Sequence, residues 1–380
     1  MTNVIASDSR LHDLLKKVCA TDRVALDTEA DSLHSYREKL CLIQISVASD
    51  NLTSPEADAM TEAPGSPISI PPVGESVCDF IVDPLSNLDL GRLGRGLQQK
   101  EIILHGADYD LRMLRRGLNF TPTRIFDTVI AARLLGIREF SLGALVKRFF
   151  GVELHKHSQK ANWAVRPLSP RMMKYAINDV HYLLPLAAKL EQQLELCHRR
   201  DWFRQSCERA IELATTVRER SADEVWRIPG AGALEPHAGA VLRALWHWRE
   251  AEAEQSDRPP FHVLHNQELL KAAVSFACHG VPDYKHFSAR RRQTFREAAK
   301  IGLQSPQSEW PVMRRRSVTR PTAATLRRAQ ELRNRRDKWA KQLGLEASFV
   351  ASRSALEAVA ADSSRTATLL VPWQRELLGI

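Results

Sequence analysis

The sequence predicts a mixed α/β domain that ends near residue 200 and is followed by small helical modules. In the first part, strand-like apolar runs come before most of the helical segments, and one strand leads through Gly106 directly into a helix. From about residue 210 the apolar spacing is helical throughout, with breaks at Gly and Pro. A faint internal repeat relates two parts of this helical region. A chain of 380 residues is long enough for two or three domains.

Apolar spacing gives the elements of the α/β part. A short helix is expected over 11–18, because Leu11, Leu14 and Val18 share one helical face. Strands are expected over 24–29, 40–47, 80–82 and 101–105, and helices over 88–97, 127–135, 141–150 and 169–196, the last of them broken near Pro185. A further helix after Gly106 carries Leu111, Leu114 and Leu118, and Asp127-Thr128 is good N-cap chemistry. Residues 49–76 are rich in Pro, Ser and Gly without periodicity, which predicts a mobile insertion between two strands.

The helical part repeats at an offset of 87 residues. Six positions recur: Leu245, Arg249, Ala253, Val263, Leu269 and Ala273 return as Leu332, Arg336, Ala340, Val350, Leu356 and Ala360. Helical periodicity alone would produce some of these matches. The shared Arg and the interior Val favour two copies of one small helical module.

Charge and composition limit the classes of function. The net charge is +9, and residues 290–341 hold 16 Lys or Arg against 4 Asp or Glu, which indicates a polyanion partner unless these are solvated helix faces. The six cysteines are scattered without a Cys-x-x-Cys pair, which argues against a zinc ribbon or a disulfide framework and fits a reducing cytosol. No apolar stretch has the length of a membrane span, so we expect a cytoplasmic protein without a membrane partner, with a monomer as the simplest form.

Four carboxylates from three distant segments carry the candidate chemistry. Asp27 and Glu29 alternate on a strand, so both side chains point to one face, about 7 Å apart at Cα. Asp110 follows the strand that ends at His105, and Tyr175 and Asp179 share one helix face. Oxygen ligands suit Mg²⁺ or Mn²⁺, and two such ions can assist a phosphodiester displacement. The structural alternatives are a strand that runs into a polar turn, a solvated helix Asp and a half-buried packing Tyr.

The same segments resemble the three motifs of the DEDDy 3′→5′ exonucleases, above all ribonuclease D and the exosome-associated ribonucleases. The resemblance lies in the following segments: Asp27-Thr28-Glu29 with Ala30 to Tyr36, Leu40 to Gln44, His105-x4-Asp110-Leu111, Phe126-Asp127-Thr128, Trp163 with Arg166-Pro167-Leu168, and Tyr175-x3-Asp179. It implies a ribonuclease H-like exonuclease domain over 1–208. It also implies metal ligands at Asp27, Glu29, Asp110 and Asp179, with Tyr175 orienting the attacking water.

Several neighbouring residues receive subsidiary roles. Asp110 is preferred to Asp108 as the ligand because the family's Asp lies five residues after the histidine, and Asp108 is then expected to be a helix N-cap. Asp127 is expected to be structural. His105, Lys156, Lys160 and Arg166 are candidate substrate contacts, although a solvated loop is an equally good interpretation of the Lys and Arg residues.

The C-terminal part resembles the HRDC domain shared by RecQ helicases and ribonuclease D. Gly230 to Ala273, with Trp248-Arg249-Glu250 and Arg258-Pro259, carries this resemblance, which gives a first HRDC domain over 215–300 and a second HRDC-like domain over 312–378.

The resemblance implies a metal-dependent 3′→5′ exoribonuclease. It would use two divalent cations, Mg²⁺ or Mn²⁺, and release nucleoside 5′-monophosphates from RNA with a single-stranded 3′ end, such as tRNA precursors. The alternatives are a DNA 3′→5′ exonuclease and a catalytically silent RNA-binding scaffold.

Overall fold

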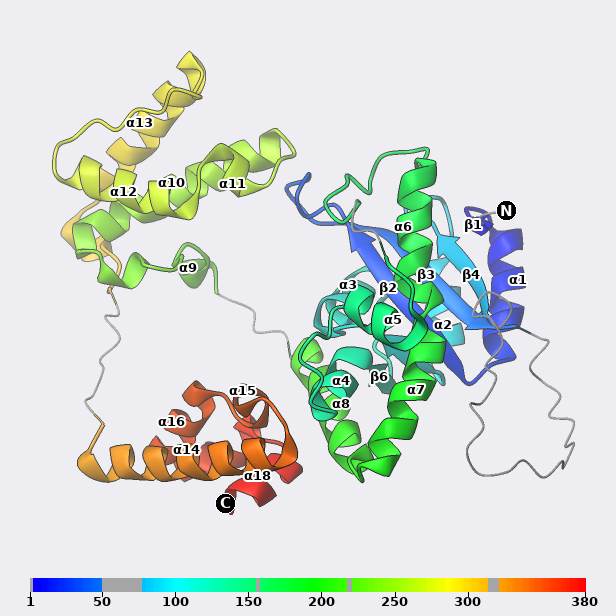
Figure 1. Cartoon of the computed structure of the whole chain (residues 1–380). Coiled ribbons are helices and arrows are strands. Elements are labelled where there is room, and N and C mark those ends of the chain that lie inside the picture. Colours follow the sequence, from blue (N-terminus) through cyan, green and yellow to red (C-terminus); the bar gives the residue numbers. More distant parts are fainter. Residues whose placement is uncertain (1–2, 50–76, 155–157, 217–220, 314–320) are drawn as a thin grey trace, which may run out of the picture. The chain divides into compact units, whose positions relative to one another are not determined.

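The computed structural model describes residues 3–49, 77–154, 158–216, 221–313 and 321–380 (Figure 1). The predicted insertion therefore lies outside the described residues, apart from position 49. The chain forms two compact units, one of residues 1–30, 40–216 and 321–380 and the other of residues 31–39 and 217–320. Each unit is described by itself below. In the described part of the chain, no helix combines the length and the apolar character needed to cross a bilayer.

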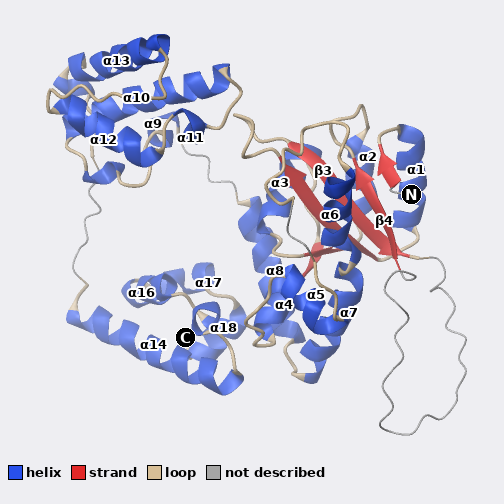
Figure 2. Ribbon diagram, turned by 45° about the horizontal axis from the view of Figure 1, so that its top comes forward, coloured by secondary structure: helices blue, strands red, loops and turns tan. Residues whose placement is uncertain are grey.

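A six-stranded mixed sheet is the centre of the first unit (Figure 2). Its order is β1-β4-β3-β2-β5-β6, and the strands are β1 (Asn3–Ile5), β2 (Arg23–Ala30), β3 (Leu40–Ala48), β4 (Val77–Val82), β5 (Glu101–Leu104) and β6 (Arg124–Asp127). Strand β3 runs antiparallel to its neighbours β2 and β4, and the other pairs are parallel. The predicted mixed sheet is confirmed. The two edge strands β1 and β6 were not predicted, because each has only one neighbouring strand, β4 or β5, and local spacing does not reveal that pairing.

The helices of this part follow the predicted order. They are α1 (Asp8–Cys19), α2 (Leu90–Leu97), α3 (Asp108–Leu118), α4 (Thr128–Leu134), α5 (Leu142–Phe150), α6 (Pro170–His181), α7 (Leu183–Leu196) and α8 (Arg200–Thr215). The long helical stretch does break, at Tyr182, and Pro185 lies in the first turn of α7, where no intrahelical N–H is needed. Helix α8 was not predicted as a separate element, and it continues past residue 208, the expected end of the domain.

Alternating side chains of β3 fill two separate cores. Ile43, Ile45 and Val47 pack with Leu11 and Leu14 of α1 on one face of the sheet. On the other face, Leu42 packs with Ala176 of α6 and with Trp163. Figures 1 and 2 both show α6 lying across this second face. The packing of α6 is what brings its polar residues over strand β2.

Asp127 fixes the corner where β5, α3 and α4 meet. Its buried carboxylate accepts hydrogen bonds from the backbone N–H groups of Val129 and Ile130, as the predicted N-cap of α4. The same carboxylate accepts from Gly106 (3.0 Å) and Ala107 (2.9 Å) at the start of α3. Gly106 has a φ of +79°, a conformation that glycine adopts without strain. The predicted structural role of Asp127 fits these contacts.

The helical part contains two segments with matching helices. The first holds α9 (Ala222–Val225), α10 (Pro236–Gln255), α11 (Pro260–Val263), α12 (Asn266–Ala277) and α13 (Ala289–Gln304), and the second holds α14 (Ala323–Leu343), α15 (Ala347–Val350), α16 (Arg353–Ala361), α17 (Thr366–Leu369) and α18 (Pro372–Leu378). Helices α14, α15 and α16 begin at positions 323, 347 and 353, each 87 residues after the starts of α10, α11 and α12 at 236, 260 and 266. Short 3-10 turns lie at Ala231–Ala233, Gln307–Glu309 and Ser363–Arg365.

The shared arginine makes the same contact in both segments. Arg249 Nη1 donates to the carbonyl oxygen of Leu264 at 3.2 Å, and Arg336 Nη1 donates to that of Ala351 at 3.1 Å. Residues 264 and 351 again differ by 87. This contact explains why an arginine recurs within an otherwise apolar pattern. It satisfies a carbonyl group at the end of the short helix that follows, α11 in the first segment and α15 in the second.

The C-terminal segment packs against the α/β part within the first unit. The rings of Trp202 and Trp373 stack with centroids 5.0 Å apart, and Trp373 Nε1 donates to Ser206 Oγ at 3.1 Å. Arg199 Nη2 donates to the carbonyl oxygen of Leu343 at 2.9 Å. Trp373 belongs to the same hydrophobic core as the sheet.

Candidate active site

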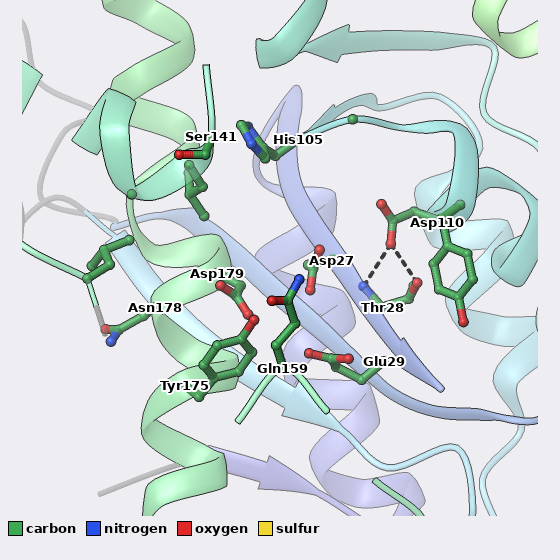
Figure 3. A pocket seen from close by; sticks show the side chains of 15 residues that line it. Asp27, Thr28, Glu29, His105, Asp110, Ser141, Gln159, Tyr175, Asn178 and Asp179 are labelled. Carbon is green, nitrogen blue, oxygen red and sulfur yellow. Dashed lines mark hydrogen bonds between the residues drawn. The ribbon is translucent and has the colours of Figure 1, made fainter. Parts of the chain in front are cut away.

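Strand β2 carries two acids toward one cavity. Asp27 and Glu29 lie at alternate positions near its carboxyl end, so both point to the face that α6 covers. Asp179 reaches the same place from α6, and carboxylate oxygens of Asp27, Glu29 and Asp179 lie within 4.8 Å of one another. Figure 3 shows the three groups converging. Two remote segments thus supply one cluster of three acids.

Asp110 lies beside this cluster and is held by Thr28. Strands β2 and β5 are parallel, so the turn after β5 places the first residues of α3 near the carboxyl end of β2. Asp110 Oδ1 accepts hydrogen bonds from the Thr28 N–H at 3.0 Å and from Thr28 Oγ1 at 2.5 Å (Figure 3). Asp110 is outside the 4.8 Å group, but it lines the same cavity and acts electrostatically on Asp27 and Glu29.

Tyr175 lies one helical turn before Asp179. Its hydroxyl donates a hydrogen bond to the Asp179 carboxylate, and its ring packs against Trp163 with centroids 5.9 Å apart. Spacing of four residues on α6 produces this contact, as the sequence predicts. The phenol is fixed at both ends, which keeps its oxygen at the edge of the acidic cluster.

All five predicted catalytic residues line one cavity of about 410 Å³. The described residues around it are Asp27, Thr28, Glu29, His105, Gly106, Tyr109, Asp110, Ser141, Leu142, Gly143, Leu154, Gln159, Tyr175, Asn178 and Asp179. None of these described lining residues is a lysine or an arginine, so no lysine or arginine of this described wall neutralises the carboxylates.

Burial and mutual repulsion raise the pKa values of the four acids. Burial, followed by the charges of Asp110 and Asp179, raises the pKa of Asp27 well above its usual range. The same effects raise the pKa of Glu29 to about 9. Burial also raises the pKa values of Asp110 and Asp179 to about 7, against the opposing hydrogen bonds from Thr28 and Tyr175. The pKa of the Tyr175 phenol is raised by burial and by the nearby Asp179 charge, so this group stays neutral.

The cluster fits divalent cations. Mg²⁺ and Mn²⁺ prefer carboxylate oxygens and water as ligands, and the described cavity wall supplies carboxylates without a competing cation. Positive charge at this place would offset the repulsion that raises the pKa values. The donor set is therefore suited to a hard divalent metal, in agreement with the prediction of a metal site.

The other predicted contacts have different surroundings. His105 lines the cavity, and its Nδ1 lies 2.8 Å from Thr128 Oγ1. Lys160 is exposed and is not among the described lining residues, and Lys156 lies outside the described part of the chain.

Arg166 is not placed as a substrate contact, which corrects that expectation. Its Nε and Nη2 each donate to Asp83 at 2.7 Å, and its remaining donors reach the carbonyl oxygens of Trp163, Val165 and Cys41. All five guanidinium N–H donors can be used inside the domain in this way. Arg166 joins the loop before α6 to the ends of β3 and β4.

Asp108 is also corrected. The N-cap of α3 is Ala107, and Asp108 is the first helical residue, exposed and paired with Arg112 at 2.6 Å. It does not line the cavity.

Sequence reasoning did not select several residues of the cavity wall. Thr28 and Asn178 are direct neighbours of predicted ligands, so their positions next to Asp27 and Asp179 were a usable signal. Ser141 caps α5, and Gln159 lies in the loop before α6. Nothing in the periodicity of the sequence distinguishes these two from other polar loop residues.

Comparison with known families agrees with this geometry. The profile of the family described as 3′-5′ exonuclease matches residues 2–63 and 68–195, which is half of the 380-residue chain. The chain therefore belongs to the 3′-5′ exonuclease family. The HRDC domain profile matches residues 238–276, which confirms an HRDC domain in the helical part.

Within this family the chain is similar to ribonuclease D, as its motifs predict. The ribonuclease D of Sphingobium indicum is 30% identical over 272 residues, which cover 71% of this chain and 63% of that protein. The chain thus spans less than two thirds of the length of this relative. Escherichia coli RNase D, described as an exoribonuclease involved in structured RNA processing, has a TM-score of 0.70 at 22% identity, over 100% of this chain and 96% of its own. A protein from Bifidobacterium adolescentis has a TM-score of 0.77 at 21% identity, with coverages of 99% and 94%. The two structures establish a shared fold.

Proposed function

We propose that this chain is a metal-dependent exoribonuclease that removes nucleotides one at a time from RNA 3′ ends. Water would attack the terminal phosphodiester and release nucleoside 5′-monophosphates. The observation that carries this proposal is the meeting of Asp27, Glu29 and Asp179 within 4.8 Å, beside Asp110 and Tyr175, in one cavity. A catalytically silent scaffold would have no need to retain such a repulsive cluster.

The four acids are assigned as ligands of two divalent cations, Mg²⁺ or Mn²⁺. When bound, such ions supply electrostatic stabilisation for the attacking and leaving oxygens of a phosphodiester displacement. Asp27 would hold both ions, because the charges of Asp110, Asp179 and Glu29 all act on it. Thr28 positions Asp110 by its two hydrogen bonds.

Tyr175 is assigned to the attacking water. Its pKa is raised above its usual range, so the phenol remains protonated and can donate a hydrogen bond or accept one from water. This role requires a correctly positioned hydroxyl group and does not require its ionisation. The hydroxyl is positioned by its hydrogen bond to Asp179 and by the packing of the ring against Trp163. His105, which lines the same cavity, is proposed as a contact to the substrate.

The proposed substrate is RNA with a single-stranded 3′ end, such as a tRNA precursor or another small structured RNA. The similarity to ribonuclease D supports RNA, and the description of the Escherichia coli enzyme supports a structured RNA body. The excess of basic residues over 290–341 supports a polyanion. Lys160, which is exposed in the loop before α6, remains a candidate contact to the RNA.

The chain is proposed to comprise an exonuclease domain over 1–208, a first HRDC domain over 215–300 and a second HRDC-like domain over 312–378. The common offset of 87 residues between α10–α12 and α14–α16 supports two copies of one module. The matching contacts of Arg249 and Arg336 support it independently.

Side-by-side digestion of matched RNA and DNA oligomers tests the function. Each oligomer should carry a stable hairpin and a single-stranded 3′ tail, and the reaction should be run with Mg²⁺ and with a chelator. We expect the RNA tail to shorten stepwise to 5′-monophosphates with Mg²⁺ only. Faster loss of the DNA would favour the DNA exonuclease alternative, and release of oligonucleotides would contradict an exonuclease.

A further inference from the structure

The two copies of the helical module share a core but differ on one helix face. Leu245, Ala253 and Val263 of the first copy are buried, and so are their counterparts Leu332, Ala340 and Val350. The face in question comprises positions 241, 248 and 252 of α10, which correspond to Arg328, Arg335 and Trp339 of α14 at the offset of 87. We call Arg328, Arg335 and Trp339 the α14 stripe.

In the first copy this face is covered. Val241 is fully buried, and the ring of Trp248 packs on Phe287 and Phe295 with centroids 5.6 and 4.9 Å away. The Glu252 carboxylate accepts from Arg290 and Arg291. Phe295 and both arginines belong to α13, a helix of 16 residues.

The C-terminal copy covers the face much less. Within residues 321–380 the last helix, α18, has 7 residues, and Arg335 reaches it through a hydrogen bond of 2.9 Å to the Leu378 carbonyl. Arg328 is exposed, and 37% of the Trp339 surface is accessible. A tryptophan and two arginines thus occupy positions where a buried helix face would carry apolar or paired residues.

The net charge of α14 also differs from that of α10. Helix α10 has two Lys or Arg and three Asp or Glu, whereas α14 has seven Lys or Arg and two Asp or Glu. The respective net charges are −1 and +5. Lys338 and Lys341 of the same helix are exposed and contribute to this positive charge. Such a face is complementary to a polyanion and unfavourable for an apolar partner.

We infer that the α14 stripe binds a single-stranded part of the RNA substrate, with a base stacked on Trp339 and phosphates next to Arg328 and Arg335. This inference rests on the proposed function. The stripe spans about 16 Å along the helix at 1.5 Å per residue, room for more than one nucleotide. An exposed indole beside positive charge is the combination that single-strand binding uses, because an unpaired base offers its face and a duplex does not.

The test measures affinity and its salt dependence in the full chain. Binding of a long uridine oligomer is measured in a chelator, which prevents digestion, and hydrolysis of a short uridine oligomer is measured with Mg²⁺. We expect Trp339→Ala to raise the Kd of the long oligomer about tenfold, equivalent to about 1.4 kcal/mol. The salt slope, which is the slope of the logarithm of the binding constant against the logarithm of the salt concentration, should be unchanged. Arg328→Gln should reduce that slope by about 0.7, the loss of one phosphate contact. Hydrolysis of the short oligomer should be unchanged in both variants.

Arg353→Gln is the matched control, because Arg353 is an exposed arginine of α16 in the same module and should change neither quantity. Trp339→Phe should keep most of the affinity, since a phenyl ring also stacks. If a folded Trp339→Ala variant binds like the wild type, or if Arg328→Gln leaves the salt slope intact, the inference is wrong while the proposed function stands. Equal loss for duplex RNA would overturn the single-strand assignment. A wild-type chain that neither binds nor trims RNA would overturn the proposed function itself.

Discussion

Thr28 and Asp110, 82 positions apart in the chain, are joined by two hydrogen bonds to one carboxylate oxygen. The Thr28 side chain points away from Asp27 and Glu29, its neighbours on β2, because side chains alternate along a strand. One strand therefore presents two acids to the cavity on one side and positions a third acid with the residue between them.

We expect Thr28→Val to weaken metal binding. The hydroxyl lowers the pKa of Asp110, so its loss should raise that pKa above about 7 and leave more of the carboxyl protonated at neutral pH. Loss of such a supporting hydrogen bond typically reduces metal affinity about 10–100-fold. The measurement is the half-saturating Mg²⁺ concentration for hydrolysis as a function of pH. Thr28→Ser retains the hydroxyl and should behave like the wild type; equal weakening in both would contradict this role.

Asp27→Asn should abolish hydrolysis and preserve RNA binding. Removal of one preorganised electrostatic group costs about 10²–10³ in rate in other enzymes, and the charges of the other three acids all act on Asp27. Single-turnover rates and Kd values on the same RNA separate the two effects. Asp108→Asn, which removes an exposed acid outside the cavity, is the control with unchanged rate. An Asp27→Asn variant that still trims RNA would show that the site is misassigned.

Tyr175→Phe should lower kcat by about 10²-fold, the lower end of the range for a side chain positioned to assist proton transfer, with little change in KM. The phenol is neutral throughout the working pH range, so its loss should not remove a limb from the pH–rate profile. Steady-state kinetics over a pH series measure both effects. Tyr182→Phe alters a ring that packs on Phe150 outside the cavity and should leave kcat unchanged. An unaltered kcat in Tyr175→Phe would remove the tyrosine from the mechanism.

The stability of the chelated protein should fall as pH rises. The folded-state pKa values of Glu29 (about 9), Asp110 and Asp179 (about 7) exceed the ordinary carboxyl values near 4, so the folded chain binds more protons than the unfolded chain between these limits. Folding is therefore favoured at low pH within this window and loses stability as pH rises through about 7 to 9. Divalent cations should restore Tm, and the increase should be larger at the higher pH. Thermal unfolding with chelator and with Mg²⁺ measures it.

Glu29→Gln supplies the matched comparison for this pH dependence. It removes one of the repelling charges, so the chelated variant should have a higher Tm than the wild type at high pH and gain less from Mg²⁺. A wild-type Tm that does not depend on pH in chelator would contradict the raised pKa values.

Arg166→Ala should destabilise the fold by about 2–4 kcal/mol, because removal of one partner of a largely buried pair leaves Asp83 without its counter-charge. Denaturant unfolding of the chelated protein measures the loss. Lys160→Ala changes an exposed loop residue and should stay within about 0.5 kcal/mol. A higher KM for RNA with unchanged stability would instead restore Arg166 as a substrate contact.

Much of the α/β part follows from the sequence because its strands are buried and its helices amphipathic. The runs at 24–29 and 40–47 lie within the observed strands, and Asp127 caps α4 as its position indicates. Strands β1 and β6 depend on pairing with β4 and β5, partners that local spacing cannot reveal. The break between α6 and α7 was placed close to Tyr182, since proline marks the first turn of the second helix.

Less of the site than of the fold could be predicted from the sequence. The acids and Tyr175 could be selected because strand and helix periodicities place them on defined faces. The role of Arg166 could not, because its partners Asp83 and Cys41 lie 83 and 125 positions away and only the fold brings them together. For the same reason, Thr28 gave no sign of its bond to Asp110.

The Asp127 corner has a consequence for how the cavity receives its ligands. One carboxylate holds four amide groups from two chain segments, so the first turns of α3 and α4 cannot shift independently. Asp110 lies only two residues into α3, and its Cα is therefore located before any ion or nucleic acid arrives. Little conformational entropy remains to be lost at this wall on binding, and more of the interaction free energy is available for affinity.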